Sequence, residues 1–228
     1  MVLDDIELTV RPGEILALIG PSGCGKSTLL NILSGLLAPD AGELFIDGTP
    51  ARQFDDWRRV AYMFQEDRLL PWRTVRDNVA FGLESARLPL AERRHRATAA
   101  LRLVGLEAVA TAWPHELSGG MRSRVALARS LAVRPTLLLM DEPFSRLDPE
   151  TRSQMHEELL RIHAGSGMTV IFVTHDMEEA VVLADRILRL VPRPGRIAEE
   201  LDLGDLPRPR IPTDADVAER VRQLRVRS

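Results

Sequence analysis

The chain has 228 residues, of which 45% are hydrophobic and 28% are charged, and its formal net charge is -3. This length and composition can support a substantial buried core, so they exclude a chain that is disordered by default. The slightly negative charge provides no basic field that could gather the phosphates of DNA or RNA, and we therefore expect no nucleic-acid partner.

The apolar stretches are short. The most continuous ones, Leu137–Met140 and Thr169–Val173, are far below the roughly 20 residues that a membrane-spanning helix needs. The first ten residues carry acids in place of the basic flank and apolar run of a signal peptide, and Cys24 is the only cysteine, so no internal disulfide can form. We therefore expect a chain without a membrane span that works in the reducing cytoplasm.

Short strands are expected first, because β-rich runs bounded by turns open the chain. These runs are Ile6–Val10, Ile15–Ile19, Glu43–Ile46 and Val60–Phe64. The second run leads into a glycine-rich stretch, after which the pattern predicts a helix over Ser27–Leu36.

The middle of the chain, from about residue 66 to residue 134, has apolar residues three and four positions apart, which predicts helices. The expected helices are Val75–Leu83, Ala91–Val104 and Met121–Leu131.

Strands are expected again in the last part. The two continuous apolar runs named above are typical of buried parallel strands, and the helical stretch Pro149–His163 separates them. Arg186–Val191 and Ile197–Leu201 suggest a hairpin, and Asp214–Arg225 a final polar helix. The core is therefore expected to be α/β and split in the sequence by a helical insertion.

The glycine-rich stretch fits the pattern G-x-x-x-x-G-K-[ST] at the place that the pattern requires, after a strand and before a helix. In such a loop the backbone amides hold the α and β phosphates of a nucleotide, Lys26 reaches the β and γ phosphates, and Ser27 binds Mg²⁺. The predicted site consists of Gly20, Pro21, Ser22, Gly23, Cys24, Gly25, Lys26, Ser27 and Thr28.

Lysine usage supports this site. Lys26 is the only lysine among the 30 basic side chains, and all the others are arginine. An arginine ends in a wide planar fork, whereas a lysine is a thin point charge that can enter a loop and meet a phosphate end-on. The one position that keeps lysine is therefore the one where this geometry is needed.

Two carboxylates follow the strand expected at Leu137–Met140. Asp141 would hold Mg²⁺, directly or through water, and Glu142 would polarise the water that attacks the γ phosphate. An Asp-Glu pair at a strand end is, by itself, more often a solvated terminus. Together with the phosphate loop upstream, the pair indicates the second half of a nucleotide site.

A third motif narrows the class of protein. Residues 117–121, Leu-Ser-Gly-Gly-Met, lie at the start of an expected helix, where Ser118, Gly119 and Gly120 could form a second anion site. On its own the motif could be a serine-capped helix with a flexible entry. With RSRVALARSLAVRP after it, the segment resembles the signature motif of ABC ATPases. The resemblance implies that two copies pack head to tail and that each ATP lies between the phosphate loop of one copy and the signature of the other.

Three further positions match the family in order. Gln65 resembles the glutamine that senses Mg²⁺ and the attacking water and faces the membrane partner. Asp148 resembles the aspartate that crosses the dimer interface, and His175 the histidine that touches the γ phosphate. The resemblance thus implies that Glu142, His175 and Gln65 are catalytic and that Ser27, Gln65 and Asp141 hold the metal.

The segments FQEDRLLPWRTVRDNVAFGL, PHELSGGM, DEPFSRLD and LPRPR are similar to those of importer ATPases of the nitrate, sulfonate and taurine type. Arg146 departs from this pattern where a small residue is common, and Ser123 where glutamine is usual, which should weaken a polar contact. The family also stacks adenine on an aromatic side chain well upstream of the loop lysine, yet no aromatic precedes Phe45. Either the natural chain starts upstream of Met1, or adenine is held without that stack.

The resulting prediction is a single ABC ATPase domain over residues 1–228, of the α/β class. It has a RecA-like P-loop NTPase core (residues 1–65 and 135–205) with an antiparallel β part, an inserted helical subdomain (66–134) and a C-terminal tail (206–228). We expect a homodimer that hydrolyses ATP beneath integral-membrane permease subunits, at the cytoplasmic face of the inner membrane, and serves a solute-binding protein indirectly.

Two alternatives stay open. An exporter or lipid-extracting ATPase would share all of the ATP chemistry, and only the neighbourhood of Leu69–Trp72 argues for import. A soluble ABC protein acting on DNA, chromatin or ribosomes usually has coiled-coil insertions, paired ATPase domains or zinc-binding cysteines, and this sequence has none of them.

Overall fold

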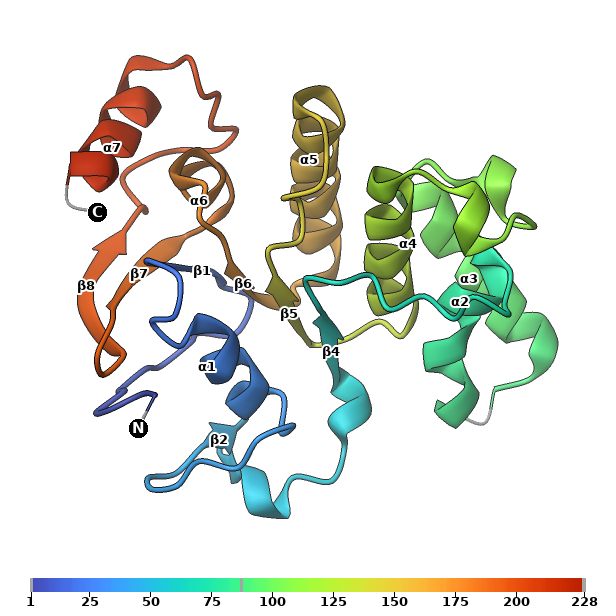
Figure 1. Cartoon of the computed structure of the whole chain (residues 1–228), viewed down its shortest axis with the longest axis horizontal. Helices are drawn as coiled ribbons and strands as arrows, with labels where there is room; N and C mark the ends of the chain where they lie inside the picture. Colours follow the sequence, from blue (N-terminus) through green and yellow to red (C-terminus); the bar gives the residue numbers. More distant parts are fainter. Residues whose placement is uncertain (1, 87, 227–228) are drawn as a thin grey trace. The chain divides into compact units, whose positions relative to one another are not determined.

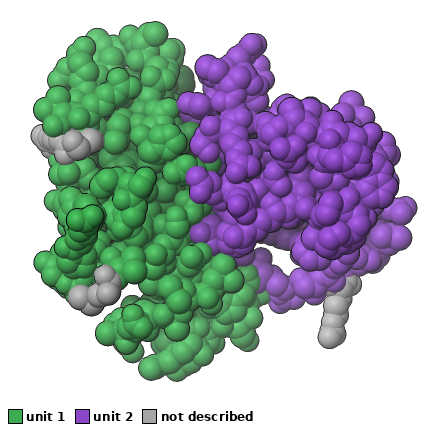
Figure 2. All heavy atoms as spheres, viewed as in Figure 1, with its two compact units in different colours: residues 1–57, 139–142, 167–228 green, residues 58–138, 143–166 purple. Residues whose placement is uncertain are grey.

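The computed structural model describes residues 2–86 and 88–226. Internal contacts divide the chain into two units (Figure 2): unit 1 comprises residues 1–57, 139–142 and 167–228, and unit 2 comprises residues 58–138 and 143–166. Met1, at which the expected domain starts, and residues 227–228 of the expected tail lie outside the described residues. The expected helical subdomain, residues 66–134, falls within unit 2.

Parallel strands form the centre of unit 1. β1 (Ile15–Ile19) lies between β6 (Thr169–Val173) and β7 (Arg186–Val191) and runs parallel to both. All five residues of β1 are buried, as expected for an apolar run covered on both faces. The end of β5 (Leu137–Asp141) lies beside β6, and the N–H of Glu142 donates to the carbonyl of Val173 at 3.0 Å. The strands predicted from continuous apolar runs are therefore confirmed.

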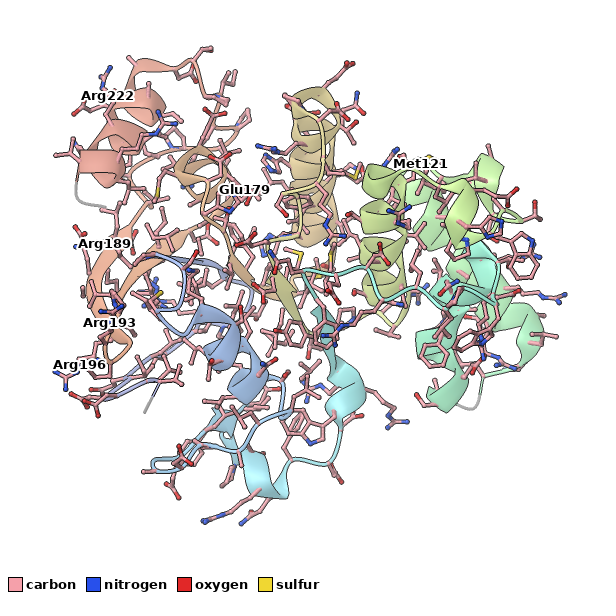
Figure 3. All side chains as sticks on the ribbon, viewed as in Figure 1. Met121, Glu179, Arg189, Arg193, Arg196 and Arg222 are labelled. Atoms are coloured by element: carbon pink, nitrogen blue, oxygen red, sulfur yellow. The ribbon has the colours of Figure 1, made fainter. Side chains whose placement is uncertain are left out.

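Antiparallel pairs complete the strands of unit 1. β8 (Arg196–Asp202) pairs with β7 and forms the predicted hairpin. Figure 3 labels Arg189, Arg193 and Arg196 along this hairpin. β2 (Phe45–Ile46) pairs with β3 (Thr49–Pro50), so the strand expected from residue 43 is shorter than predicted.

The strand predicted at Ile6–Val10 is wrong, because no strand is assigned over these residues, all of which the structure describes. Their exposure alternates as it would in a strand, which explains why the sequence pattern was misleading. The segment is extended, but its backbone is held by a side chain: the Arg186 guanidinium donates to the carbonyl of Thr9.

The helices of unit 1 are α1 (Lys26–Leu33), α6 (Met177–Leu183) and α7 (Ala215–Val226). Figure 1 shows α7 beside α6, and α6 also contacts β1. No sequence pattern predicted α6, which has only seven residues, too few to show helical periodicity. The Asp176 side chain caps it by accepting from the N–H groups of Glu178 and Glu179 at 2.9 and 3.3 Å.

Unit 2 is mainly helical. α2 (Val75–Ala80), α3 (Leu90–Leu103) and α4 (Gly119–Ala132) pack against one another (Figure 1). The unit also contains α5 (Pro149–Ser166) and β4 (Val60–Met63), as well as the first residues of β5. The N–H of Thr136 donates to the carbonyl of Arg59 at 2.9 Å, which holds the start of β5 beside the start of β4.

Short 3-10 segments connect these elements. They are Ala51–Gln53, Trp57–Arg59, Phe81–Ala86, Glu107–Val109 and Pro114–Glu116. The helix predicted over Val75–Leu83 is therefore divided between α2 and the 3-10 segment after it. Within residues 2–86 and 88–226, no helix has the length and apolar character needed to cross a bilayer.

Candidate functional site

The phosphate loop joins β1 to α1 within unit 1. Gly20 has a φ of +144°, and a Cβ there would lie 2.4 Å from the carbonyl oxygen of Leu190. Gly25 has a φ of +97°, and a Cβ there would lie 2.4 Å from Leu3. Both positions therefore require glycine, for backbone conformation and for space. Gly23 also has a positive φ, of +80°, but faces open space, which leaves the backbone of the loop accessible.

Lys26 lies inside this loop and is only 9% exposed. Its ammonium donates to the carbonyls of Gly20 and Pro21 at 2.7 and 2.9 Å, and lies 3.7 Å from the sulfur of Cys24. The loop therefore closes around a lysine charge at the N-terminal end of α1, where backbone amides and a positive helix end favour an anion.

Asp141 ends β5 and is 8% exposed. Burial raises the pKa of Asp141 above its usual value; a hydrogen bond from the Ser27 side chain lowers it, the Glu142 charge raises it and Lys26 lowers it. A carboxylate bonded to a hydroxyl offers the hard oxygen donors that Mg²⁺ prefers. No group of three or more His, Cys, Asp or Glu side chains that could hold a metal is found in the part of the chain that the structure describes. The donor set therefore fits an ion that takes its other ligands from phosphate oxygens and water.

Glu142 follows Asp141 directly and has a φ of +47°, a backbone conformation that is unfavourable for a non-glycine residue. The bond from its N–H to Val173 holds it there. Its carboxylate Oε2 lies 3.5 Å from Nδ1 of His175. The Glu142 side chain is 23% exposed and that of His175 is 68% exposed, so both can meet a ligand.

The ends of β1, β5 and β6 thus bring most of the predicted residues of unit 1 to one edge of the sheet. Thr174, buried between β6 and α6, donates its N–H to the carbonyl of Leu18, so β6 stays aligned with β1 up to the residue before His175. The edge combines an anion cradle, a buried carboxylate with a hydroxyl, and a carboxylate beside an imidazole.

The signature residues lie in unit 2, at the start of α4, where Figure 3 labels Met121. Ser118 is exposed and caps the helix: its hydroxyl accepts from the N–H of Met121 at 3.2 Å. A Cβ on Gly120 would lie 3.2 Å from the Leu147 side chain, so the glycine allows the helix to begin close to residues 145–148. Ser123 is buried and donates to the carbonyl of Gly119 at 3.2 Å, a bond within the helix that a serine can make.

Two more predicted residues belong to unit 2. Asp148 is exposed and accepts from the N–H of Thr151 at 3.0 Å, which caps α5 and lowers the pKa of Asp148. Gln65 is exposed and follows β4. Arg146, the charged residue where a small one is usual, is exposed as well.

Sequence reasoning missed three residues that fix the segment after Gln65. Asn78 of α2 is fully buried; it accepts from the N–H of Leu70 at 2.7 Å and lies within 3.1 Å of the carbonyls of Leu70, Arg73 and Thr74. Arg122 and Arg129 of α4 bind the same segment. A polar residue at an apolar helical position, and two arginines seven residues apart on one helix face, were the available signals.

In a comparison with known protein families, residues 3–145 match the family described as ABC transporter. The aliphatic sulfonates import ATP-binding protein SsuB 1 of Xanthomonas axonopodis pv. citri (strain 306) is 50% identical over 210 residues, which cover 92% of this chain and 82% of that protein. The nitrate import ATP-binding protein NrtC of Synechococcus elongatus is 47% identical over 213 residues, 92% of this chain, but the chain spans only 32% of that protein's length.

A solved structure also matches. The dimeric structure of a post-hydrolysis state of the ATP-binding cassette MJ0796, bound to ADP and Pi, superposes with a TM-score of 0.81 and 35% identity, covering 88% of this chain and 90% of that one. This similarity confirms the predicted mixed α/β fold with its parallel sheet, antiparallel hairpin and helical region. The chain therefore belongs to the ABC transporter family and is an ATPase of that family.

Proposed function

We propose that the chain energises an importer for a small solute such as nitrate, a sulfonate or taurine, by ATP-driven closure of a head-to-tail homodimer. The observation that carries the ATPase chemistry is the edge of unit 1, where Glu142 lies beside His175 and directly after the Ser27-bonded Asp141. The names of the two import proteins above support the direction of transport and the class of solute.

In the proposed reaction, the loop from Gly20 to Thr28 holds the ATP phosphates, and Lys26 exchanges its carbonyl contacts for phosphate oxygens. Glu142 accepts a proton from the water whose oxygen attacks the γ phosphorus, while the bond to the β-phosphate oxygen breaks. His175 would contact the γ phosphate and orient it. Mg²⁺, held by Ser27 and Asp141, would neutralise charge on the phosphates.

The second half of each site is proposed to come from another copy of the chain. Ser118 caps α4 with its side chain exposed, so the start of that helix is available to an anion. Asp148 is exposed at the start of α5, as a residue that crosses a dimer interface must be. The neighbour MJ0796 was solved as a dimer bound to ADP and Pi, which favours the same assembly here.

The membrane partner is proposed to contact the segment after Gln65. Trp72 in this segment is 69% exposed and is therefore accessible to a partner. We infer integral-membrane permease subunits as that partner, a peripheral location at the cytoplasmic face of the inner membrane, and an indirect link to a solute-binding protein.

The variant Glu142→Gln tests the chemistry, because it keeps the side-chain shape and removes the base. We expect turnover to fall at least 100-fold while ATP binding is kept, so that an ATP-bound dimer accumulates. ATPase rate and gel-filtration mass with ATP and Mg²⁺ measure both. A variant that hydrolyses ATP at the wild-type rate would remove Glu142 from its role.

Uptake measurements test the transport assignment. In a strain lacking the gene, we expect uptake of labelled nitrate, taurine or an alkanesulfonate to be lost for at least one solute. The wild-type gene should restore it and the Glu142→Gln gene should not. Unchanged uptake of all three solutes would contradict the proposed class of solute.

A further inference from the structure

The segment after Gln65 is tied to the signature helix by arginines of α4, all within unit 2. Nε of Arg122 donates to Oδ2 of Asp67 at 3.1 Å, and Nη1 of the same guanidinium donates to the carbonyl of Leu117 at 2.7 Å. Leu117 immediately precedes Ser118, and Asp67 lies two residues after Gln65. One planar fork therefore contacts both functional segments at once, through two N–H groups held at a fixed separation.

Arg129, two turns further along α4, contacts the same segment through its backbone. Its Nη1 donates to the carbonyl of Arg68 at 2.9 Å and its Nη2 to the carbonyl of Asp67 at 2.6 Å. Burial lowers the pKa of Arg129 and the Asp67 charge raises it in part. The Arg68 guanidinium in turn lies 3.8 Å from the centre of the Phe64 ring. The segment is thus fixed to α4 at successive residues.

Arg122 and its neighbour Met121 also bond directly to the signature serine, Ser118. The backbone N–H of Arg122 donates to the carbonyl of Ser118 at 3.0 Å, and that of Met121 to its hydroxyl. A shift of the Arg122 side chain therefore acts on the residues that hold Ser118. The side chains of Arg122 and Asp67 are 35% and 19% exposed, so solvent only partly screens their pairing.

We propose that Asp67 and Arg122 are positioning residues that couple the segment after Gln65 to the signature serine. A displacement of that segment by the permease is passed through Arg122 to Leu117 and Ser118, and so to the ATP held by the opposite subunit. This coupling rests on the proposed function for its biological meaning. One part of the proposal can be measured on the isolated chain: that Asp67 stabilises the hydrogen bonds of the signature residues at the start of α4.

Hydrogen exchange followed by mass spectrometry tests this part of the proposal on the full chain without nucleotide. In Asp67→Asn, exchange of the Met121 and Arg122 amides should rise about threefold, the size expected for a partly exposed ion pair. Arg122→Lys should have a similar effect because an ammonium lacks the fixed planar spacing of donors through which the guanidinium meets both acceptors. The matched control, Arg96→Gln, breaks another arginine–carboxylate pair of unit 2, Arg96 with Glu92 at 2.7 Å, and should leave these amides unchanged.

A second variant guards against a general loss of stability. Asp67→Asn combined with Arg122→Gln should change exchange by no more than Arg122→Gln alone, because the two residues act through one contact. Signature amides that exchange at the wild-type rate in Asp67→Asn, or equal acceleration throughout unit 2, would overturn the coupling.

The kinetic measurement separates the coupling from the proposed function. Asp67→Asn should lower ATP turnover while ATP affinity of the monomer stays within about twofold. If exchange changes as expected but the wild-type chain hydrolyses no ATP, the coupling holds and the proposed function fails. If the wild-type chain is active and the exchange is unaffected, the proposed function holds and the coupling fails.

Discussion

The two units differ in how they hold their candidate residues. In unit 1, Lys26 and Asp141 are withdrawn from solvent, at 9% and 8% exposed, whereas the side chains of Glu142 and His175 are 23% and 68% exposed. Lys26 is held by bonds to loop carbonyls and Asp141 by a bond to Ser27. In unit 2, Gln65, Ser118 and Asp148 are all exposed. Ser118 and Asp148 cap helices, and Arg122 donates to the carbonyl of Leu117, the residue before Ser118.

The difference indicates a division of labour. A buried carboxylate and a lysine enclosed by backbone form a preorganised site that can hold and hydrolyse ATP. The capping residues Ser118 and Asp148 are exposed, so they are accessible to a group that approaches from another molecule. We therefore propose that the chemistry belongs to unit 1 and that unit 2 presents surfaces to partners. Damage to unit 2 should therefore impair the completion of the site, and damage to unit 1 the binding and hydrolysis of ATP.

Ser118→Arg should give the largest effect on unit 2. A bulky cation at the start of α4 blocks the approach of the ATP phosphates that the opposite subunit binds. We therefore expect ATP turnover to fall at least 100-fold, with little change in the binding of ATP to monomers. A phosphate-release assay measures ATP turnover, and calorimetry on monomers measures ATP binding. Ser166→Arg, a matched change at the exposed end of α5, should be silent. Loss of monomer binding in parallel with turnover would show that Ser118 serves its own subunit.

Asn78→Ala should destabilise unit 2, because it leaves the part-buried Leu70 N–H and several carbonyls without their partner. We expect a loss of about 2 to 3 kcal/mol in the free energy of unfolding, measured as a lower urea midpoint. Gln154→Ala, at an exposed position of α5, should change it by less than about 0.5 kcal/mol. Similar midpoints for the two variants would mean that Asn78 does not fix this segment.

Asp141→Asn should give a smaller effect of opposite sign on stability. Because the pKa of Asp141 is raised in the folded chain, its ionisation costs stability, and that cost grows as the pH rises from 3.8 through the folded pKa. We expect the variant to melt a few degrees higher at neutral pH without nucleotide, and the gain to vanish on acidification. Asp40→Asn, on an exposed turn, is the control. A lower melting temperature at neutral pH would contradict the electrostatic cost.

Much of unit 1 was predictable, because β1, β5 and β6 are largely apolar runs and the loop must be glycine at Gly20 and Gly25. The strand prediction at Ile6–Val10 failed for a clear reason. Alternating side chains indicate an extended backbone but not what the backbone bonds to, which here is the Arg186 side chain. Pairing is set by tertiary contacts that a local pattern does not contain.

In unit 2, the sequence predicts the signature motif but not the side-chain contacts that hold it. Ser118 was expected at a helix start because serine caps helices. The contacts of Arg122 with Asp67 and Leu117 join residues 55 and five positions apart in the sequence. Surface arginines are common in this chain, so nothing local marks the one that bridges two segments.

The most direct test of the central claim, that each ATP is served by unit 1 of one copy and unit 2 of the other, mixes two inactive variants. Lys26→Ala loses the phosphate loop function and Ser118→Arg loses the signature function. Random pairing makes half of the dimers mixed, and each mixed dimer keeps one intact site of two, so the mixture should recover about a quarter of wild-type ATPase activity. An equimolar mixture that is as inactive as either variant alone would contradict the shared site.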